Sequence, residues 1–259
     1  MSDSTNQLFR LDGKIALITG ASSGLGWHFS KVLAQAGAHV VVAARRKERL
    51  QALCDDIVAS GGKASAVALD VTDDQSVRSC FDAAEKAAGV PDVVVSNAGT
   101  TITKMAIDQT PQDFDAVMNA NLRGCWLVDT EAARRLIAAQ KSGSIVNTAS
   151  ILGERVAAAV APYAISKAGV IQATKAMALE WARYGIRVNA LLPGYVRTEL
   201  NGEFLDSEVG EKLRKRIPSR RFNALDDLDG PLLLLASDAG RAMSGATVEV
   251  DSGHLVSGL

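Results

Sequence analysis

The sequence predicts an α/β fold in which one doubly wound, parallel sheet of about seven strands is flanked by helices. Short apolar runs of strand length recur between longer helix-like stretches, an alternation typical of parallel sheets with right-handed crossovers. These runs are largely apolar rather than alternating, which indicates burial on both faces. No Pro-, Gly- or Ser-rich linker and no internal repeat divides the 259 residues. We therefore expect a single domain over 1–259.

The predicted strands each contain valine or isoleucine, β-branched residues that favour sheets, and cover residues 15–19, 39–43, 64–68, 92–96, 144–148, 187–191 and 247–250. Helical patterns lie between them, at residues 27–36, 47–60, 75–88, 111–140 and 163–184. Beyond the sixth strand, the region around 195–222 is interpreted as a substrate lid that is helical over 203–216. This lid mixes basic and acidic residues, and a solvated helix of mixed charge is favoured. The alternative is that Arg220 and Arg221 attract an anionic substrate.

Composition argues against several classes of function. The formal net charge is −1, so nothing suggests binding to nucleic acid or to anionic membranes. The first ten residues are polar, unlike a signal peptide, and no apolar run reaches the ~18 residues of a membrane span. Cys54, Cys80 and Cys125 are unclustered, which favours reduced thiols over disulfides or a metal site. We expect a cytoplasmic protein that uses no metal.

A glycine-rich turn joins the first strand to the first helix and contains Gly20, Ala21, Ser22, Ser23, Gly24, Leu25 and Gly26. Gly20 permits a tight turn, Gly24 lets backbone approach a pyrophosphate, and Gly26 allows close packing of helix on strand. The N-terminus of the helix then faces the phosphates. The Gly-x-x-x-Gly-x-Gly spacing differs from the commoner dinucleotide fingerprint. A turn without ligand is the alternative, but the strand before it and the helix after it favour phosphate binding.

Two arginines follow the second strand, where an NAD-selective site would present a carboxylate to the ribose hydroxyls. This chain has Ala44, Arg45 and Arg46 there. A guanidinium can hold a 2′-phosphate through two hydrogen bonds, so the pattern favours NADP(H) over NAD(H). The alternative, that these arginines only begin a solvated helix, stays open.

Tyr163 and Lys167 are four residues apart and share one face if their segment is helical. A phenol has a pKa of about 10, and a neighbouring ammonium favours phenolate, so we expect a lowered tyrosine pKa. Such a pair can act as an acid–base device. The Ser150 hydroxyl could hold a substrate oxygen. Most Tyr-x-x-x-Lys pairs are ordinary helix surface, so this pair gains weight only from the other motifs.

Together these motifs resemble the short-chain dehydrogenases/reductases from Leu11 to Gly253. The matching segments, in chain order, are Thr19 to Gly26, Asp70-Val71, Asn97-Ala98-Gly99, Asn119 to Leu122, Ser150, Tyr163 with Lys167, Pro193-Gly194 through Thr198, and Val250-Asp251. The resemblance implies a Rossmann fold and hydride transfer to or from a nicotinamide. Within the family, the chain is similar to 3-oxoacyl-acyl-carrier-protein reductases and to enzymes like gluconate 5-dehydrogenase.

The resemblance implies that Tyr163 is the general acid or base and that Ser150 positions the substrate oxygen. Lys167 would bind the nicotinamide ribose and lower the tyrosine pKa, and Asn121 would hold a water that relays protons. The further implied cofactor contacts are Asp70 and Val71 beside the adenine, Asn97, Ala98 and Gly99 along the cofactor, Pro193 and Gly194, and Val196 and Thr198 at the carboxamide. Simpler roles as helix interruptions or caps stay open for Asn121, Thr198 and Asp70.

Several positions depart from the family pattern. Ser96, Asn223 and Ser252 stand where Asn, Gly and Gly are usual, at positions that concern support rather than chemistry. Trp27 is bulky for its place directly after Gly26.

We expect an enzyme that interconverts a secondary alcohol and a ketone with NADP(H). The alternative is a regulatory module that senses NADPH without turnover, which would be expected to lose part of the Asn–Ser–Tyr–Lys set. A keto-sugar acid, a 3-oxoacyl thioester and a simple ketone are all open as the small-molecule substrate. The pocket candidates, for which core packing is the alternative, are Ile151, Leu152, Val160 and Tyr195. The resemblance implies a homotetramer or homodimer.

Overall fold

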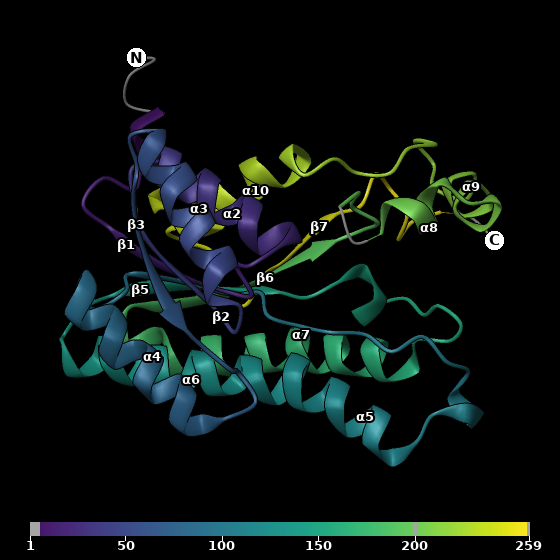
Figure 1. The fold of residues 1–259 in the computed structure, drawn as a ribbon, viewed down its shortest axis with the longest axis horizontal. Helices are drawn as coiled ribbons and strands as arrows, with labels where there is room; N and C mark the ends of the chain where they lie inside the picture. Colours follow the sequence, from purple (N-terminus) through teal and green to yellow (C-terminus); the bar gives the residue numbers. More distant parts are fainter. Residues whose placement is uncertain (1–5, 199–200, 258–259) are drawn as a thin grey trace.

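In the computed structural model, which describes residues 6–198 and 201–257, seven parallel strands form one sheet in the order β3-β2-β1-β4-β5-β6-β7 (Figure 1). The strands are β1 (Ile15–Thr19), β2 (His39–Ala44), β3 (Lys63–Ala68), β4 (Val93–Ser96), β5 (Gly143–Thr148), β6 (Ile186–Pro193) and β7 (Thr247–Val250). All seven predicted strands are confirmed, with bounds that differ by no more than two residues. The doubly wound α/β fold is thereby confirmed.

Helices cover both faces of the sheet (Figure 1). One face carries α2 (Gly24–Gln35), α3 (Lys47–Ala59) and α10 (Asp229–Ala236). The other carries α4 (Asp74–Ala87), α6 (Gly124–Ala138) and α7 (Ala161–Trp181), with α5 (Pro111–Met118) packed against α7. Short 3₁₀ turns lie at Ala106–Asp108, Ile151–Gly153, Ala182–Tyr184, Asp226–Leu228 and Asp238–Gly240. None of the described helices combines the length and apolarity needed to cross a bilayer.

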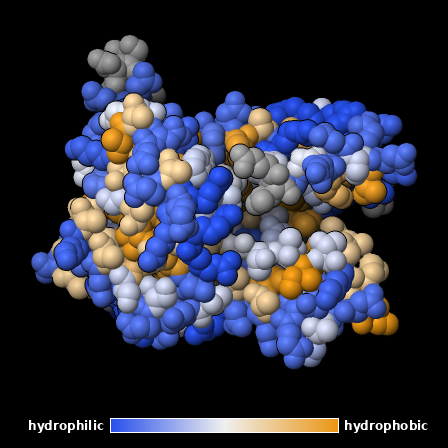
Figure 2. Space-filling model, viewed as in Figure 1, coloured by the Kyte–Doolittle hydropathy of each residue, from blue (hydrophilic) through white to orange (hydrophobic). Residues whose placement is uncertain are grey.

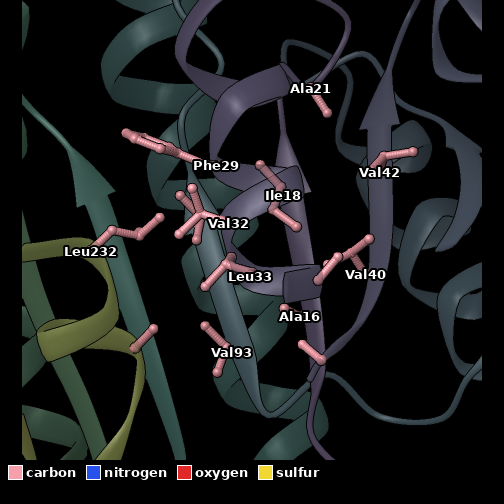
Figure 3. Packing of buried hydrophobic residues seen from close by; sticks show 14 of the residues in the cluster. Ala16, Ile18, Ala21, Phe29, Val32, Leu33, Val40, Val42, Val93 and Leu232 are labelled. Carbon is pink, nitrogen blue, oxygen red and sulfur yellow. The ribbon is translucent and has the colours of Figure 1, made fainter. Parts of the chain in front are cut away.

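The five central strands are buried between two apolar layers, as the strand composition predicts, whereas the edge strands β3 and β7 are mostly half-buried or exposed. Helix α2 directs Phe29, Val32 and Leu33 onto the strands, where they meet Ile18 and Val40 (Figure 3). A second layer on the opposite face is centred on Phe81 of α4 and Leu136 of α6, with residues from β1, β4 and β5. Burial of these side chains holds the carboxyl ends of the strands in fixed positions.

The predicted helix over 111–140 is not continuous. It begins as expected, because Thr110 and Asp113 form a reciprocal capping box at the start of α5. A π-helical turn over Asn119–Arg123 then separates α5 from α6. The side chain of Asn121 is hydrogen-bonded to the backbone of Thr100 at this turn, at 2.7 and 2.9 Å. That tertiary contact accompanies the change in helical register, which sequence periodicity did not reveal.

The lid also differs from its prediction. Two short helices, α8 (Gly202–Asp206) and α9 (Glu208–Arg214), replace the single helix expected over 203–216. Ser207 interrupts them because its backbone is extended and its hydroxyl caps α9 by accepting from Gly210 N at 3.2 Å. Residues 199–200 of the predicted lid lie outside the described residues. Figure 2 shows a notch in the surface between α8–α9 and the part of the molecule around α5.

Helix α10 was not predicted, because its run of four leucines lacks helical periodicity.

The structure explains the bulky Trp27 directly after Gly26. The guanidinium of Arg49 lies 5.1 Å from the centre of the Trp27 ring, so the indole serves as a cation–π platform between α2 and α3.

Candidate active site

The strand order reverses between β1 and β4, which are neighbours in the sheet although β2 and β3 separate them in the chain. Loops that leave these two strands therefore turn to opposite sides, and a crevice forms at their carboxyl ends. Thr19 connects the carboxyl end of β1 to the residues that follow β4. Its hydroxyl accepts from the backbone N–H groups of Asn97 (2.9 Å) and Ala98 (3.0 Å), and Asn97 Nδ2 donates to the Thr19 carbonyl at 3.0 Å.

The glycine-rich turn is held against this junction. Gly20 has a φ of +67°, and a Cβ there would lie 2.8 Å from Ala98 Cα, so only glycine fits. Ser23 begins α2 without a side-chain cap, and the first turn of α2 contains no acidic residue. The first N–H groups of the helix are consequently available to an anion, and the turn fits the pyrophosphate of a dinucleotide.

Of the two arginines after β2, Arg46 reaches the turn, where Arg49 of α3 also donates to the Ser22 carbonyl at 3.4 Å. The Arg46 guanidinium donates to the hydroxyl of Ser22 at 2.8 and 3.1 Å and to the hydroxyl of Ser23 at 2.8 Å. Arg45 instead lies near Asp70, whose pKa is lowered mainly by hydrogen bonds from Thr72 and further by the Arg45 charge. The two arginines therefore flank the end of β2, which fits a 2′-phosphate better than free ribose hydroxyls.

Other predicted cofactor residues surround the same crevice. Val71 approaches Gly124 at the start of α6, and a Cβ on Gly24 would lie 4.0 Å from Thr198 Cγ2, so Thr198 faces the turn. Val196 is buried, and Gly194 is packed against the backbone of Asp251. Pro193 ends β6 beside them. The structure thus brings the predicted residues to one edge of the sheet, and their contacts with a cofactor stay a prediction.

The acid–base residues lie next to the crevice. Lys167 is 5% exposed. Its Nζ donates to the carbonyl oxygen of Thr148 at 2.6 Å and lies 5.6 Å from the ring centre of Tyr163. Ser150 follows β5, and its oxygen accepts from Leu152 N at 3.1 Å, which leaves its proton for the Tyr163 phenol. Ser150, Tyr163 and Lys167 are therefore brought together, as their motif predicts.

The pKa of Tyr163 is raised rather than lowered, contrary to the expectation from the Tyr–Lys spacing. Burial is the largest cause, the hydrogen bond from Ser150 acts in the opposite direction, and the nearby Tyr195 raises the pKa further. Burial also lowers the pKa of Lys167 to about 8. In this arrangement the phenol keeps its proton at neutral pH, as a proton donor requires.

Asn121 is buried behind Lys167 at the π-helical turn. Its Nδ2 donates to Thr100 O (2.9 Å) and Ser166 Oγ (3.0 Å), and its Oδ1 accepts from Thr100 N. Ser166 in turn donates to the Tyr163 carbonyl at 2.7 Å. Because the Asn121 side chain is committed to these contacts, a relay water would have to bind its backbone carbonyl. Sequence patterns gave no sign of the Ser166 link.

The C-terminal segment forms a wall beside Tyr163 that the sequence did not indicate. The ring of Tyr195 lies 5.8 Å from that of His254 and 6.4 Å from that of Phe222. Arg155 donates to the His254 carbonyl and to Ser257 Oγ. Burial lowers the pKa of His254, as do the Arg155 and Arg216 charges. Two cations therefore lie near this wall.

Several lid charges form ion pairs, within the lid or with Asp227 just after it. Arg214 donates to Glu211 and Arg197 to Asp206, and Arg221 pairs with Asp227 at 2.5 Å. The ion pair of Arg221 favours the solvated, mixed-charge interpretation for that residue over anion attraction, and the role of Arg220 stays a prediction. Among the pocket candidates, Ile151 is only 1% exposed and belongs to the core, whereas Leu152, Val160 and Tyr195 are partly exposed.

Comparison with known proteins agrees with this geometry. A family model described as enoyl-(acyl carrier protein) reductase matches residues 20–254. The chain belongs to the short-chain dehydrogenase/reductase family. It is 36% identical to gluconate 5-dehydrogenase of Gluconobacter oxydans, over 96% of this chain and 98% of that protein. It is also 36% identical to a 3-oxoacyl-acyl-carrier-protein reductase of Thermotoga maritima, over 95% and 100%.

Solved structures of family members have the same fold. A gluconate 5-dehydrogenase from Burkholderia cenocepacia, in complex with NADP and tartrate, superposes with a TM-score of 0.94 at 37% identity. The match covers 98% of this chain and 100% of that one. A short-chain type dehydrogenase/reductase from Mycobacterium marinum has a TM-score of 0.91 at 39% identity, over 96% and 98%. Family membership and the Rossmann fold expected from the sequence are confirmed.

The assignment of the glycine-rich turn can be tested at Gly26, where an added Cβ would lie 2.4 Å from Gly20 O. We expect Gly26→Ala to displace the turn and to raise the Kd for NADPH at least ~10-fold, about 1.4 kcal/mol, measured by NADPH fluorescence. Gly230→Ala in α10 is the matched control, because no atom lies within 4 Å of its Cβ position. Unchanged affinity in Gly26→Ala would contradict the assignment of the turn.

Proposed function

We propose that this protein is an NADP(H)-dependent oxidoreductase that interconverts a secondary alcohol and a ketone. The observation that carries the proposal is the meeting of Ser150, Tyr163 and Lys167 beside a glycine-rich turn with an uncapped helix N-terminus. An enzyme needs both halves of this site, whereas a sensor of NADPH needs only the turn.

The cytoplasm is the proposed location, supported by three buried free cysteines.

The chain's own residues supply the proton chemistry. The bound nicotinamide would donate a hydride to the carbonyl carbon, or accept one from the alcohol. Tyr163, which burial keeps protonated, would give its proton to the carbonyl oxygen as negative charge develops there. Ser150 would position that oxygen, since its hydroxyl proton faces the phenol. The Lys167 ammonium, fixed by Thr148 O, would stabilise the phenolate that remains.

We propose a keto-sugar acid as the substrate. Relatives at similar identity include gluconate 5-dehydrogenases and 2-dehydro-3-deoxy-D-gluconate 5-dehydrogenases as well as 3-oxoacyl reductases. The site itself favours an anionic substrate over a neutral ketone, because Arg155 and Arg216 place positive charge near the wall formed by Tyr195 and His254. The region 195–222, which supplies Tyr195 and Phe222, would act as the lid that closes over the substrate.

The experiment that tests this function measures NADPH oxidation with 5-ketogluconate, acetoacetyl-CoA and a neutral ketone. We expect the highest kcat/KM for the keto acid. Tyr163→Phe should lower kcat at least ~100-fold, because it removes the proton donor, and should leave the Kd for NADPH unchanged. The matched control is Tyr184→Phe, a partly exposed tyrosine after α7. Retention of most activity by a folded Tyr163→Phe protein would sink the catalytic assignment.

Cofactor choice is tested at the end of β2. We expect Ala44→Asp combined with Arg46→Ala to lower the NADPH/NADH ratio of kcat/KM at least ~10-fold, since a charged hydrogen bond to the 2′-phosphate is lost and a repelling carboxylate is gained. Lys47→Ala, one position further along, is the control. A wild-type preference for NADH would show that the arginines have another role.

We further propose that the protein assembles as a homodimer or homotetramer through α6 and α7. The exposed side of helix α7 carries two large apolar residues, Ile165 at 51% and Leu179 at 82% exposure, among polar ones. Trp126 of α6 is 47% exposed beside it, at an apolar groove lined by Leu122 and Ala173. A second copy of this surface is the proposed occupant, because an isologous interface would bury these exposed apolar side chains.

Trp126→Asp should therefore lower the mass measured by light scattering after size exclusion, because an unpaired charge is buried at the interface. Val58→Asp is the control, since Val58 is an exposed apolar residue on α3, on the opposite face of the sheet. If both variants keep the wild-type mass, the subunits meet through another surface or not at all.

A further inference from the structure

Two polar residues behind the substrate wall share a hydrogen bond that has no assigned role. Ser252 lies just after β7, and its hydroxyl donates to Asn223 Oδ1 at 2.5 Å. Asn223 directly follows the lid and is only 2% exposed. A buried amide needs fixed partners, because an unpaired polar group inside a protein is costly. The pair joins the end of the lid to the C-terminal segment.

Ser252 has an unusual backbone conformation. Its φ is +58°, and Gly253 has a φ of +85°. The backbone N–H of His254 donates to Asp251 O at 3.2 Å, so the segment forms a turn with positive φ at both central residues. Such turns favour glycine, asparagine and aspartate, and a serine in this region costs free energy that a glycine avoids. The hydrogen bond from the Ser252 hydroxyl to Asn223 offsets part of this cost.

Asn223 is held through both its backbone and its side chain. Its backbone N–H donates to Tyr195 O, and its carbonyl accepts from Arg197 N, each at 2.9 Å. Its Nδ2 donates to Val250 O at 2.6 Å, and that carbonyl also accepts from Gly194 N at 2.9 Å. Asn223 therefore holds the backbone of Tyr195 against the end of β7.

The Ser252–Asn223 hydrogen bond connects the segments that carry the two rings of the wall. Tyr195 is bonded through its carbonyl to Asn223, and His254 is the last residue of the turn that contains Ser252. The ring centres of Tyr195 and His254 lie 5.8 Å apart, with 42° between the ring planes. This tilted contact depends on where the two backbones are held, because neither ring can change position without its own segment.

We propose that Asn223 and Ser252 are positioning residues that act together, through their hydrogen bond, to hold Tyr195 and His254 in place for the substrate. The proposal rests on the proposed function, in which this wall lines the substrate site. Glycine is usual in the family at both positions, so the pair is a feature of this chain. Loss of the pair should raise the KM for the substrate and leave kcat and the affinity for NADPH unchanged.

The position of the wall is measured first, without substrate, by NMR of protein labelled with carbon-13 at histidine Cε1. The chain has three histidines, and the His254 signal is assigned by its loss in His254→Gln. An aromatic ring shifts the resonances of its neighbours, so Asn223→Gly and Ser252→Gly should each move the His254 signal relative to Tyr195. The other two histidines, on α2 and β2, are internal controls whose signals should stay in place. An unchanged His254 signal in both variants would overturn the proposal.

Kinetics with 5-ketogluconate then separate positioning from folding. Ser252→Gly and Ser252→Ala both remove the hydroxyl, but only the glycine variant also relieves the positive φ. We expect both variants to raise KM roughly 3-fold or more, and Ser252→Ala to have the lower Tm. Ser79→Ala, which removes an exposed hydroxyl on α4, is the control and should change neither value. If only the less stable Ser252→Ala is impaired, the serine has a structural role alone and the proposal fails.

A double-mutant cycle tests whether the two residues act as a pair. Asn223→Gly and Ser252→Gly each break the same hydrogen bond, so the second change should cost little once the first is made. We expect the fold-increase in KM of the double variant to be at least ~2-fold smaller than the product of the two single increases. Single effects that simply multiply would show independent action and would overturn the proposal. The cycle is also run on the His254 shift, which needs no turnover, so failure of the proposed substrate and failure of the pair give different results.

Discussion

The hydroxyl of Thr19 ties together the two strands on which the whole site depends. By accepting from the backbone of Asn97 and Ala98, it fixes the end of β1 against the end of β4. This contact forces the chain past Gly20 in a left-handed conformation and places Gly99 beside Asn121 and Lys167, 3.1 Å and 3.8 Å from a Cβ position on Gly99. The phosphate-binding turn and the acid–base residues are thus two consequences of one junction.

Burial then determines the chemistry. A lysine with 5% exposure keeps its charge only because fixed dipoles replace water, and Thr148 O is the nearest of them. The same desolvation raises the pKa of Tyr163 above its ordinary value and lowers that of Lys167 to about 8, so the two values move apart. Burial therefore keeps the phenol protonated beside an ammonium that loses its proton more readily, a difference that a solvated surface site would not produce.

Much of this was readable from the sequence. Strand 15–19 was predicted with the bounds observed, because a strand buried on both faces is a short, uninterrupted apolar run. The bounds of the half-buried edge strand 247–250 were also predicted, from its two valines. The glycine turn and the Ser–Tyr–Lys triplet were readable because their spacing is local. The π-turn at Asn121, the break at Ser207 and the raised pKa of Tyr163 were not, since each depends on partners or on burial that only the tertiary fold supplies.

Substrate selectivity is the least local property of all. Arg155, Tyr195, Arg216 and His254 come from four separate segments, and only the final fold brings them to one wall. Asp251 orders this wall, because its carboxylate accepts from Gly253 N and Leu255 N at 2.9 and 2.6 Å. Ser150 lies directly after β5, and Tyr163 and Lys167 lie on α7, elements fixed by the core, whereas the wall lies on loops and the C-terminal segment. Sequence change in the wall can therefore alter the substrate without disturbing the proton chemistry.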